Sequence, residues 1–248
     1  MKRLADAGRR KSLFVLDKPF VVMGVLNVTP DSFYDGGRFD SLSAAADYAR
    51  VLINEGADVL DIGGESTRPG AEPVHTDREL SRVLPLVRAV RAFSPIPISV
   101  DTTKSVVAEQ ALDAGADWIN DISAGRFDDA MAPLAARRDC PVVLMHSRER
   151  PDTMQHAPHY DDVIAEVCEE LTASVEKFRN AGVAATNIIL DPGIGFAKRF
   201  VDNIVILRKL DSLLKMGYPL LIGTSRKSFI GWITGAKTDE RLWGTLGS

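Results

Sequence analysis

Side chains that could take part in chemistry recur directly after short apolar runs of this sequence. The run 21–26 ends at Asn27, and the polar segment 29–39 that follows contains the aromatic pair Phe33-Tyr34. A continuous apolar run of this length indicates a strand buried on both faces, and an aromatic pair is unusual in a segment that only connects two elements. We therefore expect the segment to carry function. A surface loop whose ring packs back onto the protein is the alternative.

Polar residues end the apolar runs throughout the chain. They are Asn27, Asp61, Asp101, Asn120, His146, Asp191 and Thr224. A single Asp or Asn at such a position often caps the following helix. Because the carboxyl ends of parallel strands meet at one edge of a sheet, seven such residues together predict a binding site at that edge.

The segment 61–70 has the composition of an anion-binding loop. Paired glycines allow the backbone to turn sharply, and Arg68 follows Thr67 on a Gly/Pro-rich stretch. A guanidinium donates to phosphate or carboxylate groups as a bidentate fork, and a neighbouring hydroxyl adds a donor. An arginine that only faces solvent is an equally good interpretation.

Two further segments point to a flat polar ligand. The segment 191–198 places glycines after a strand-ending aspartate, and the segment 223–229 begins a helix and directs a lysine toward the same edge. The inward polar set is Asp101, Asn120, Asp191 and Lys227. Two carboxylates, one amide and one cation suit the edge of a planar heterocycle that carries amino, ring N–H and carbonyl groups. The side chains of Met145 and Phe196 could contact the faces of such a ring.

Zinc chemistry and covalent catalysis are not expected. The four histidines form no H-E-x-x-H motif. No nucleophile has an obvious base partner, so nothing suggests a covalent enzyme intermediate.

The composition favours one domain that binds a small molecule. The chain has 248 residues, 45% of them hydrophobic, and 30 basic against 34 acidic residues give a net charge of −4. This length allows one large core, and the charge argues against nucleic acid or an acidic membrane as the main partner. Cys140 and Cys168 are far apart, and the sequence shows neither a signal-peptide pattern nor an apolar run of ~20 residues. We expect a cytoplasmic protein with free thiols.

Strands and helices alternate along the chain. The predicted strands are 21–26, 59–64, 96–101, 118–122, 141–146, 188–191 and 219–224, and the predicted helices are 42–56, 77–93, 103–114, 128–138, 160–181 and about 200–216. Strands that are each followed by a helix imply parallel pairing with right-handed crossovers. No G-x-G-x-x-G follows the first strand, which argues against a dinucleotide-binding sheet. The polar strand ends favour an α/β fold of the TIM (β/α)8 barrel type.

The expected barrel lacks its last strand in this sequence. A full barrel has eight strands, and the sequence stops soon after a helix that begins near Asp239. We expect residues 1–248 to form a single TIM-barrel domain that is truncated at its C-terminus. A partner chain that closes the sheet is the less economical alternative.

At the segments described above, the sequence closely resembles the dihydropteroate synthase family of folate biosynthesis, from about residue 20 to the end. The matching motifs are Asn27-Val28-Thr29-Pro30-Asp31-Ser32-Phe33, the segment 61–70, Val100-Asp101-Thr102, Asn120-Asp121, Met145-His146, Thr153-Met154-Gln155, the segment 191–196 and Ser225-Arg226-Lys227. The resemblance implies a transferase that joins 6-hydroxymethyl-7,8-dihydropterin pyrophosphate to p-aminobenzoate in an SN1-like displacement, giving 7,8-dihydropteroate and pyrophosphate. It also implies a homodimer and a target of sulfonamides.

The resemblance further implies a role for individual residues. Pterin is expected to bind to Asp101, Asn120, Ile122, Met145, Asp191, Phe196, Gly223 and Lys227. The p-aminobenzoate pocket is expected at Phe33, Thr67, Arg68, Pro69, Lys227 and Ser228. Pyrophosphate is expected at Asn27, Asp31, Thr67 and Arg68, with Asn27 also holding the cofactor Mg²⁺. The residues implied to act in catalysis are Asp101, Lys227, Asn27 and Arg68.

Two departures from the family pattern keep alternatives open. The family carries Arg-x-His on an eighth strand that this sequence lacks, and Phe200-Val201-Asp202 stands where the family more often has polar residues. A pterin-binding domain of a methyltransferase should lack the loop 66–69 and the turn 225–227, so the sequence argues against it. A pterin-binding paralogue without catalysis is disfavoured by the presence of Asn27, Asp31 and Arg68, but the missing strand keeps that interpretation open.

Overall fold

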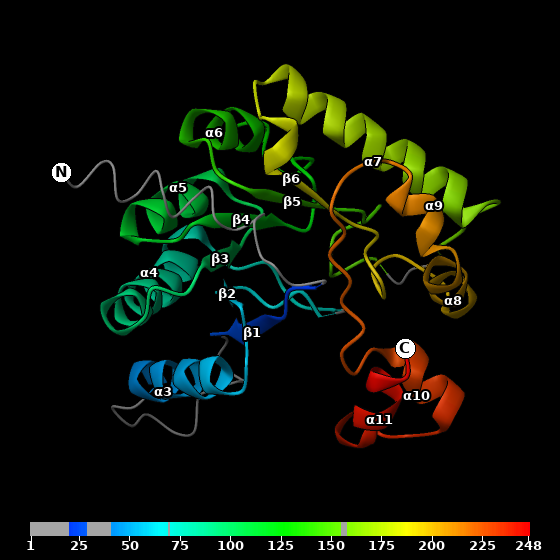
Figure 1. Cartoon of the computed structure of the whole chain (residues 1–248), viewed down its shortest axis with the longest axis horizontal. Helices are drawn as coiled ribbons and strands as arrows, with labels where there is room; N and C mark the ends of the chain where they lie inside the picture. The colour runs from blue at the N-terminus through cyan, green and yellow to red at the C-terminus, as the bar shows by residue number, and fades with distance from the viewer. Residues whose placement is uncertain (1–19, 29–40, 69, 155–157) are drawn as a thin grey trace. The chain divides into compact units, whose positions relative to one another are not determined.

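A computed structural model of the chain describes residues 20–28, 41–68, 70–154 and 158–248 (Figure 1). These residues form two compact units. The first unit contains the described residues up to Ser66 together with Pro73–Asn120, and the second contains those of 67–72 together with Asp121–Ser248.

The first unit is built on parallel strands that follow one another in sequence order. They are β1 (Met23–Asn27), β2 (Val59–Gly63), β3 (Ile98–Asp101) and β4 (Trp118–Asp121), with helices α3 (Ser41–Asn54), α4 (Thr76–Phe93) and α5 (Ser105–Ala114) between them. Every residue of β2 is buried. Burial of both faces explains why Val59, Leu60 and Ile62 are all apolar, and Asp61 is the exception in this strand.

The helices of the first unit pack through regular apolar faces. In α4, the residues Val83, Leu86, Val87 and Val90 are all fully buried, and their spacing of three and four places them on one helical face. Helix α5 ends where Gly115 adopts a left-handed φ of 117° and its N–H donates to the last turn. Glycine adopts this conformation without steric cost, so the helix stops there and β4 can begin.

Among the described residues, the second unit holds fewer strands and more helices than the first. Its parallel strands are β5 (Val142–Met145) and β6 (Ile188–Asp191), and its α-helices are α6 (Met131–Arg138), α7 (Val163–Asn180), α8 (Phe200–Arg208), α9 (Leu210–Leu214), α10 (Ser228–Thr234) and α11 (Leu242–Leu246). Short 3₁₀ helices lie at Ala185–Asn187 and Thr238–Glu240. Helix α7 begins after Asp162, whose carboxylate accepts from two backbone N–H groups of its first turn.

Most of the predicted elements are confirmed, and two predictions are wrong. The segment 219–224 is not a strand: one bridge joins Leu220 to Leu190, held by backbone bonds around that residue alone. The two backbone hydrogen bonds made by Leu190 are too few to form a ladder of strand pairing. The residues of the segment are half-buried or exposed, whereas a central strand would be buried. The helix expected over 200–216 is interrupted at Lys209, whose backbone leaves the helical region.

The departure 200–202 has a structural role at the start of α8. The carboxylate of Asp202 accepts from the backbone N–H of Arg199 at 2.8 Å and from its guanidinium at 2.9 Å. An acidic residue in the first helical turn also complements the helix dipole. Phe200 stacks on Trp232 of α10, with ring centroids 3.7 Å apart.

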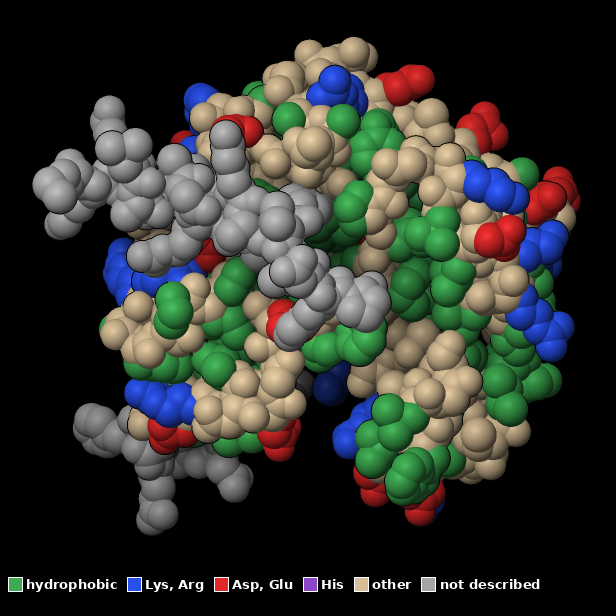
Figure 2. Space-filling view, viewed as in Figure 1, with side chains coloured by type: hydrophobic (Ala, Val, Ile, Leu, Met, Phe, Trp, Pro, Cys, Tyr) green, Lys and Arg blue, Asp and Glu red, His purple; other side chains and the backbone are tan. Residues whose placement is uncertain are grey.

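Helices α10 and α11 present apolar side chains to solvent. Figure 2 shows hydrophobic side chains gathered over these helices at the lower right. Trp243 is 79% exposed, and only Phe229 and Ile230 of α10 are buried. No helix in the described part of the chain is long and apolar enough to span a membrane.

Candidate functional site

Polar residues predicted for the site form one row across the strands of the first unit. The pairing register places Asn27 beside Gly63, Gly63 beside Asp101, and Asp101 beside Asn120. Paired residues of parallel strands point to the same face of a sheet. The sequence prediction that these strand ends meet at one edge is confirmed within this unit.

Gly63 provides the space that the polar side chains of this row occupy. A Cβ at Gly63 would lie 2.8 Å from Asn27 Oδ1 and 3.4 Å from Asp101 Oδ2. Both oxygens therefore approach the same glycine, one from each neighbouring strand. Any side chain at position 63 would displace at least one of them.

A buried carboxyl group orients the amide of Asn120. Asn120 Nδ2 donates to Asp61 Oδ2 at 3.0 Å, and both residues are buried. Burial raises the pKa of Asp61 above its ordinary value of 3.8, and the nearby Ser99 hydroxyl and the hydrogen bond from Asn120 oppose that rise. The sequence pattern marked Asp61 as a strand-end residue but gave no sign that it would hold a neighbouring amide in place.

The base of the 61–70 loop is held by ionic contacts. Lys104 contacts the carboxylates of both Glu65 and Glu79, the second at 2.6 Å. Arg82 donates to the carbonyl oxygen of Gly64 at 2.7 Å. Charge-assisted hydrogen bonds are stronger than neutral ones, so this loop leaves β2 in a fixed direction.

In the second unit, Met145 and Asp191 end neighbouring strands side by side. The register of β5 and β6 pairs them, and the N–H of His146 donates to the carbonyl oxygen of Asp191 at 2.8 Å. Asp191 Oδ1 accepts from the N–H of Gly193 at 2.7 Å. One carboxylate oxygen is therefore used to shape the loop that begins after β6.

Apolar residues predicted to contact a ring lie together in this unit. A buried cluster contains Ile122, Met145, Met154, Phe196 and Ala197. Met154 has only 1% exposure and was not among the predicted site residues. Its position in the matched motif 153–155 was the one available signal.

Lys227 and Phe196 come into direct contact. The Lys227 ammonium lies 4.2 Å from the centroid of the Phe196 ring, within the range of a cation–π interaction. A Cβ at Gly195 would approach Lys227 Cδ to 3.0 Å, and Gly195 has a left-handed φ of 82°. Glycine at 195 therefore allows both the loop conformation and the approach of the lysine.

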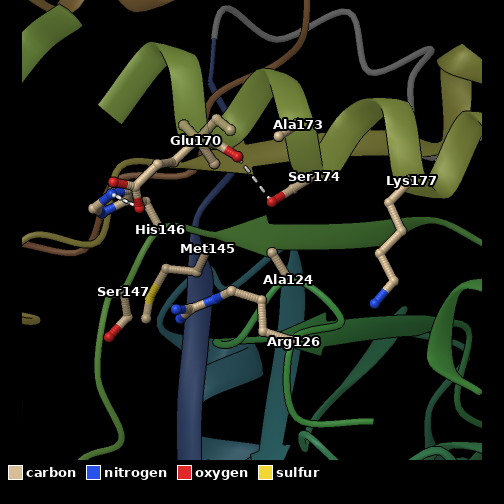
Figure 3. A pocket seen from close by; sticks show the side chains of 10 residues that line it. Ala124, Arg126, Met145, His146, Ser147, Glu170, Ala173, Ser174 and Lys177 are labelled. Atoms are coloured by element: carbon tan, nitrogen blue, oxygen red, sulfur yellow. Dashed lines mark hydrogen bonds and ion pairs between the residues drawn. The ribbon is translucent and has the colours of Figure 1, made fainter. Parts of the chain in front are cut away.

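A cavity of about 260 Å³ lies beside β5. Side chains from α7, the end of β5 and the loop after β4 line it (Figure 3). Figure 3 shows Glu170 of α7 pointing toward His146, and Glu170 Oε2 lies 3.1 Å from His146 Nε2. The His146 side chain is 1% exposed, so this contact is made by a buried imidazole on the cavity wall.

A buried lysine contacts the other side of His146. Lys198 Nζ lies 2.9 Å from His146 Nδ1, 3.1 Å from the Phe196 carbonyl oxygen and 3.3 Å from the His146 carbonyl oxygen. Burial, followed by the charge of Lys198, lowers the pKa of His146 to about 4. The sequence pattern includes Lys198 at the end of a ligand-binding segment but does not reveal its contact with His146, which lies 52 residues earlier in the chain.

Other predicted residues lie on exposed segments or outside the described ones. Thr67 is half-buried and Arg68 exposed on a loop whose Gly70 N–H donates to the Pro151 carbonyl oxygen at 3.0 Å. Gly223 and Ser228 are exposed. Asp31 and Phe33 lie outside the described residues, as do the rest of the segment 29–39 and Pro69.

The row of polar strand ends in the first unit offers two oxygen atoms near Gly63 that could face a metal, Asn27 Oδ1 and Asp101 Oδ2. Among the residues that the structure describes, no three His, Cys, Asp or Glu side chains gather as metal ligands. Asn27 Oδ1 approaches the Gly63 backbone from the same side as Asp101 Oδ2. Mg²⁺ prefers oxygen ligands and usually keeps several waters, so it needs few ligands from the protein. The amide oxygen of Asn27 is therefore a suitable single protein ligand for it.

Comparison with known proteins identifies close relatives. Residues 23–248 match the family described as "Pterin binding enzyme". The chain is 50% identical over 236 residues to a dihydropteroate synthase of Synechocystis sp., covering 95% of this chain and 82% of that protein. Two solved structures are also similar. A Clostridium difficile dihydropteroate synthase with pteroic acid gives a TM-score of 0.88 at 42% identity, covering 94% and 87% of the two chains.

The second similar structure is a Xanthomonas albilineans dihydropteroate synthase with 4-aminobenzoic acid. It gives a TM-score of 0.87 at 44% identity and covers 93% of this chain and 82% of its own. At this identity and TM-score the chain shares the fold of both solved proteins. The predicted α/β fold of the TIM-barrel class is confirmed.

Proposed function

The chain belongs to the dihydropteroate synthase family of pterin-binding enzymes, and from this premise we propose the reaction that it catalyses and the residues that carry it. The reaction is the condensation of 6-hydroxymethyl-7,8-dihydropterin pyrophosphate with p-aminobenzoate, which gives 7,8-dihydropteroate and pyrophosphate. The 50% identity over 95% of the chain is the observation that supports it most strongly.

Pterin recognition is assigned to residues of both units. In the first unit, Asp101 and Asn120 are adjacent in the register row and offer a carboxylate and an oriented amide. In the second unit, Asp191 and Lys227 offer hydrogen-bonding groups, while Ile122, Met145 and Phe196 offer apolar contacts; Gly223 completes the proposed set. A pterin presents amino, ring N–H and carbonyl groups at its edge, which these groups match.

The remaining roles concern the leaving group and the second substrate. We assign pyrophosphate to Asn27, Asp31, Thr67 and Arg68. We assign p-aminobenzoate to Phe33, Thr67, Arg68, Pro69, Lys227 and Ser228. Exposed Arg68 is suited to an anion because its guanidinium donates in a planar fork.

Asp101 and Asp191 stabilise the positive charge that develops during the displacement. The bond between the pterin methylene carbon and the pyrophosphate oxygen breaks first, and the electron pair leaves with pyrophosphate. The amine of p-aminobenzoate then attacks the methylene cation and loses a proton. Carboxylates fixed before the reaction lower the energy of such a cation without reorganising. Mg²⁺, held by Asn27, would neutralise charge on the departing pyrophosphate.

The proposal is tested by measuring pyrophosphate release from the purified chain. Release that requires both the pterin pyrophosphate and p-aminobenzoate supports it, and addition of EDTA should suppress that release. Binding of pterin without any release would instead favour the paralogue that lacks catalysis.

Two further features are proposed on the same premise. A homodimer is expected, and light scattering on the eluting protein measures its mass directly. A cytoplasmic location is expected, and fractionation of cells that produce the protein tests it.

A further inference from the structure

Lys198 is a fully buried cation at a point where two segments of the second unit meet. It has 3% exposure and lies in the loop between β6 and α8. Its ammonium group reaches the carbonyl oxygen and the imidazole of His146, directly after β5, and the carbonyl oxygen of Phe196 in its own loop. Burying an ammonium is costly unless it is hydrogen-bonded, so these contacts explain how the residue is tolerated there.

The two segments that Lys198 joins carry the ring-contacting residues. His146 follows Met145 directly, and Phe196 belongs to the loop itself. The loop packs so closely here that a Cβ at Gly193 would collide with the carbonyl oxygen of His146. Tyr160 Oη adds a second anchor by donating to the carbonyl oxygen of Ala197 at 2.8 Å.

We propose that Lys198 is a positioning residue for pterin binding, which holds the loop after β6 against the end of β5 and thereby fixes Phe196 relative to Met145. The inference rests on the proposed function, because it concerns the ligand that those two side chains contact. Lys198 itself touches neither substrate nor reacting atoms in this assignment. It acts through the two carbonyl oxygens and the imidazole.

His146 connects this lysine to a carboxylate on α7. A charged lysine only donates, so His146 Nδ1 accepts and the imidazole proton is assigned to Nε2. Nε2 lies 3.1 Å from Glu170 Oε2, a close contact without the geometry of a hydrogen bond. The contact with His146 and the hydrogen bond from Arg148 lower the pKa of Glu170 to about 2, so this carboxylate stays ionised.

Loss of the Lys198 proton would disturb the whole arrangement. A neutral amine with two protons can serve the two carbonyl oxygens only if it accepts from His146 Nδ1. The imidazole proton then leaves Nε2, and a ring lone pair faces the Glu170 carboxylate. The protonated lysine is therefore the state that donates to both segments at once, and pterin affinity should fall when pH rises, even though the free energy of unfolding increases over the same range.

The charged groups around Lys198 set the pH at which this happens. Burial lowers the pKa of Lys198 to about 7, Arg148 lowers it further, and the carboxylates of Asp191, Glu170 and Asp202 raise it. His146 is neutral in this range because its own pKa is about 4. The change in affinity is thus expected near neutral pH.

The test compares the affinity of Lys198→Met and of the unchanged protein for 6-hydroxymethylpterin by calorimetry from pH 6 to pH 9. Ionisation of the ligand cancels in the ratio of the two dissociation constants. We expect a ratio of about ten at pH 6, since one charge-assisted interaction is lost, and a ratio below about three at pH 9. Lys215→Met is the matched control, because its side chain is 76% exposed, and it should give a ratio near one throughout.

Three results would overturn the inference in distinguishable ways. If the unchanged protein binds no pterin, the proposed function fails and this inference fails with it. If it binds pterin and the Lys198→Met ratio is near one at every pH, the positioning role alone is wrong. A ratio that is large but independent of pH would show a structural role without the link to the lysine proton, and would also reject it.

Glu170→Gln keeps the question open to measurement if Lys198→Met does not fold. The Glu170 side chain is 39% exposed, so its loss is easier to accommodate. Removing this carboxylate lowers the pKa of Lys198, because Glu170 raises it. The pH midpoint of pterin affinity should therefore move down by about half a unit or more relative to the unchanged protein; an unchanged midpoint would reject the proposal.

Discussion

At the scale of single residues, Asp101 is the side chain on which the proposed chemistry depends most. It lies in the row between Gly63 and Asn120, with which it is paired in the strand register. Asp61 orients the amide of Asn120, so the Asp101 carboxylate lies beside an amide of fixed direction. Preorganisation of this kind is what makes a single charge effective against a developing cation.

Asp101→Asn should lower kcat/KM for pyrophosphate release by about 100-fold or more, which corresponds to roughly 3 kcal/mol of transition-state stabilisation. The substitution keeps the shape of the side chain and removes its charge. Asp211→Asn serves as the control, because that carboxylate is 71% exposed and far along the chain in α9. Activity of Asp101→Asn within threefold of the unchanged protein would contradict the assigned role.

At the scale of elements, the loop after β6 depends on glycine for two separate reasons. Gly193 has a φ of 69° and no space for a Cβ, whereas Gly217 has a φ of 80° and no atom within 4 Å of a Cβ. The positive φ would strain any L-residue at either position, but only a side chain at position 193 would also collide with a backbone atom, the carbonyl oxygen of His146.

Gly193→Ala should therefore destabilise the protein clearly more than Gly217→Ala, which should cost about 1 kcal/mol from backbone strain alone. Urea unfolding of both variants gives the difference directly. Gly193→Ala should in addition weaken pterin binding, because its loop carries Phe196. Equal destabilisation by the two variants would show that the contact with the His146 carbonyl oxygen has no energetic weight.

Arg91 joins α4 to the turn before β4. Its guanidinium contacts Asp117 Oδ2 at 2.5 Å and donates to the carbonyl oxygens of Gly115 and Ile96, each at 2.8 Å. Asp117 Oδ2 also accepts from the Ile98 N–H at 3.0 Å. The arginine thus fixes the starts of β3 and β4, whose other ends carry Asp101 and Asn120.

Arg91→Met should reduce the free energy of unfolding by about 3 kcal/mol, because it leaves a mostly buried carboxylate without its guanidinium. Arg88→Met, on an exposed position of the same helix, should change it by less than about 0.5 kcal/mol. Chemical denaturation measures both. If Arg91→Met lowered the free energy of unfolding no more than Arg88→Met, the guanidinium of Arg91 would not be needed to stabilise the Asp117 carboxylate.

At the scale of the whole molecule, buried bases should make stability rise with pH. Lys198 has a pKa of about 7 in the folded state against 10.5 when exposed, so the unfolded chain binds more protons between these values. The same holds for His146 between about 4 and 6.5. By linkage, the free energy of unfolding increases with pH in both windows.

The difference of 3.5 units for Lys198, from 10.5 to about 7, corresponds to at most about 5 kcal/mol gained between pH 7 and pH 10.5. Lys198→Met should remove this part of the slope, and Lys215→Met should keep it. Urea midpoints at pH 7, 8, 9 and 10 measure the slope. Identical slopes for Lys198→Met and the unchanged protein would contradict the shifted pKa.

The sequence alone predicted the alternation of elements and most of the polar residues at the strand ends. Strands of a buried parallel sheet are mostly apolar, so a polar residue at the end of such a strand can be recognised from the sequence alone. This pattern is sufficient to place Asn27, Asp101 and Asn120 at one edge of the sheet. The family resemblance, confirmed by the relatives, added the chemistry that spacing cannot give.

Only the tertiary structure decided which groups support those residues. The contact of Glu170 with His146, the burial of Lys198 and the orientation of Asn120 by Asp61 join positions that are distant in the chain. The failure of 219–224 to form a strand has the same origin, because a strand exists only through hydrogen bonds to neighbours. Local composition determines which residues prefer burial or a turn, whereas pairing, burial and pKa arise from neighbours that folding alone brings together.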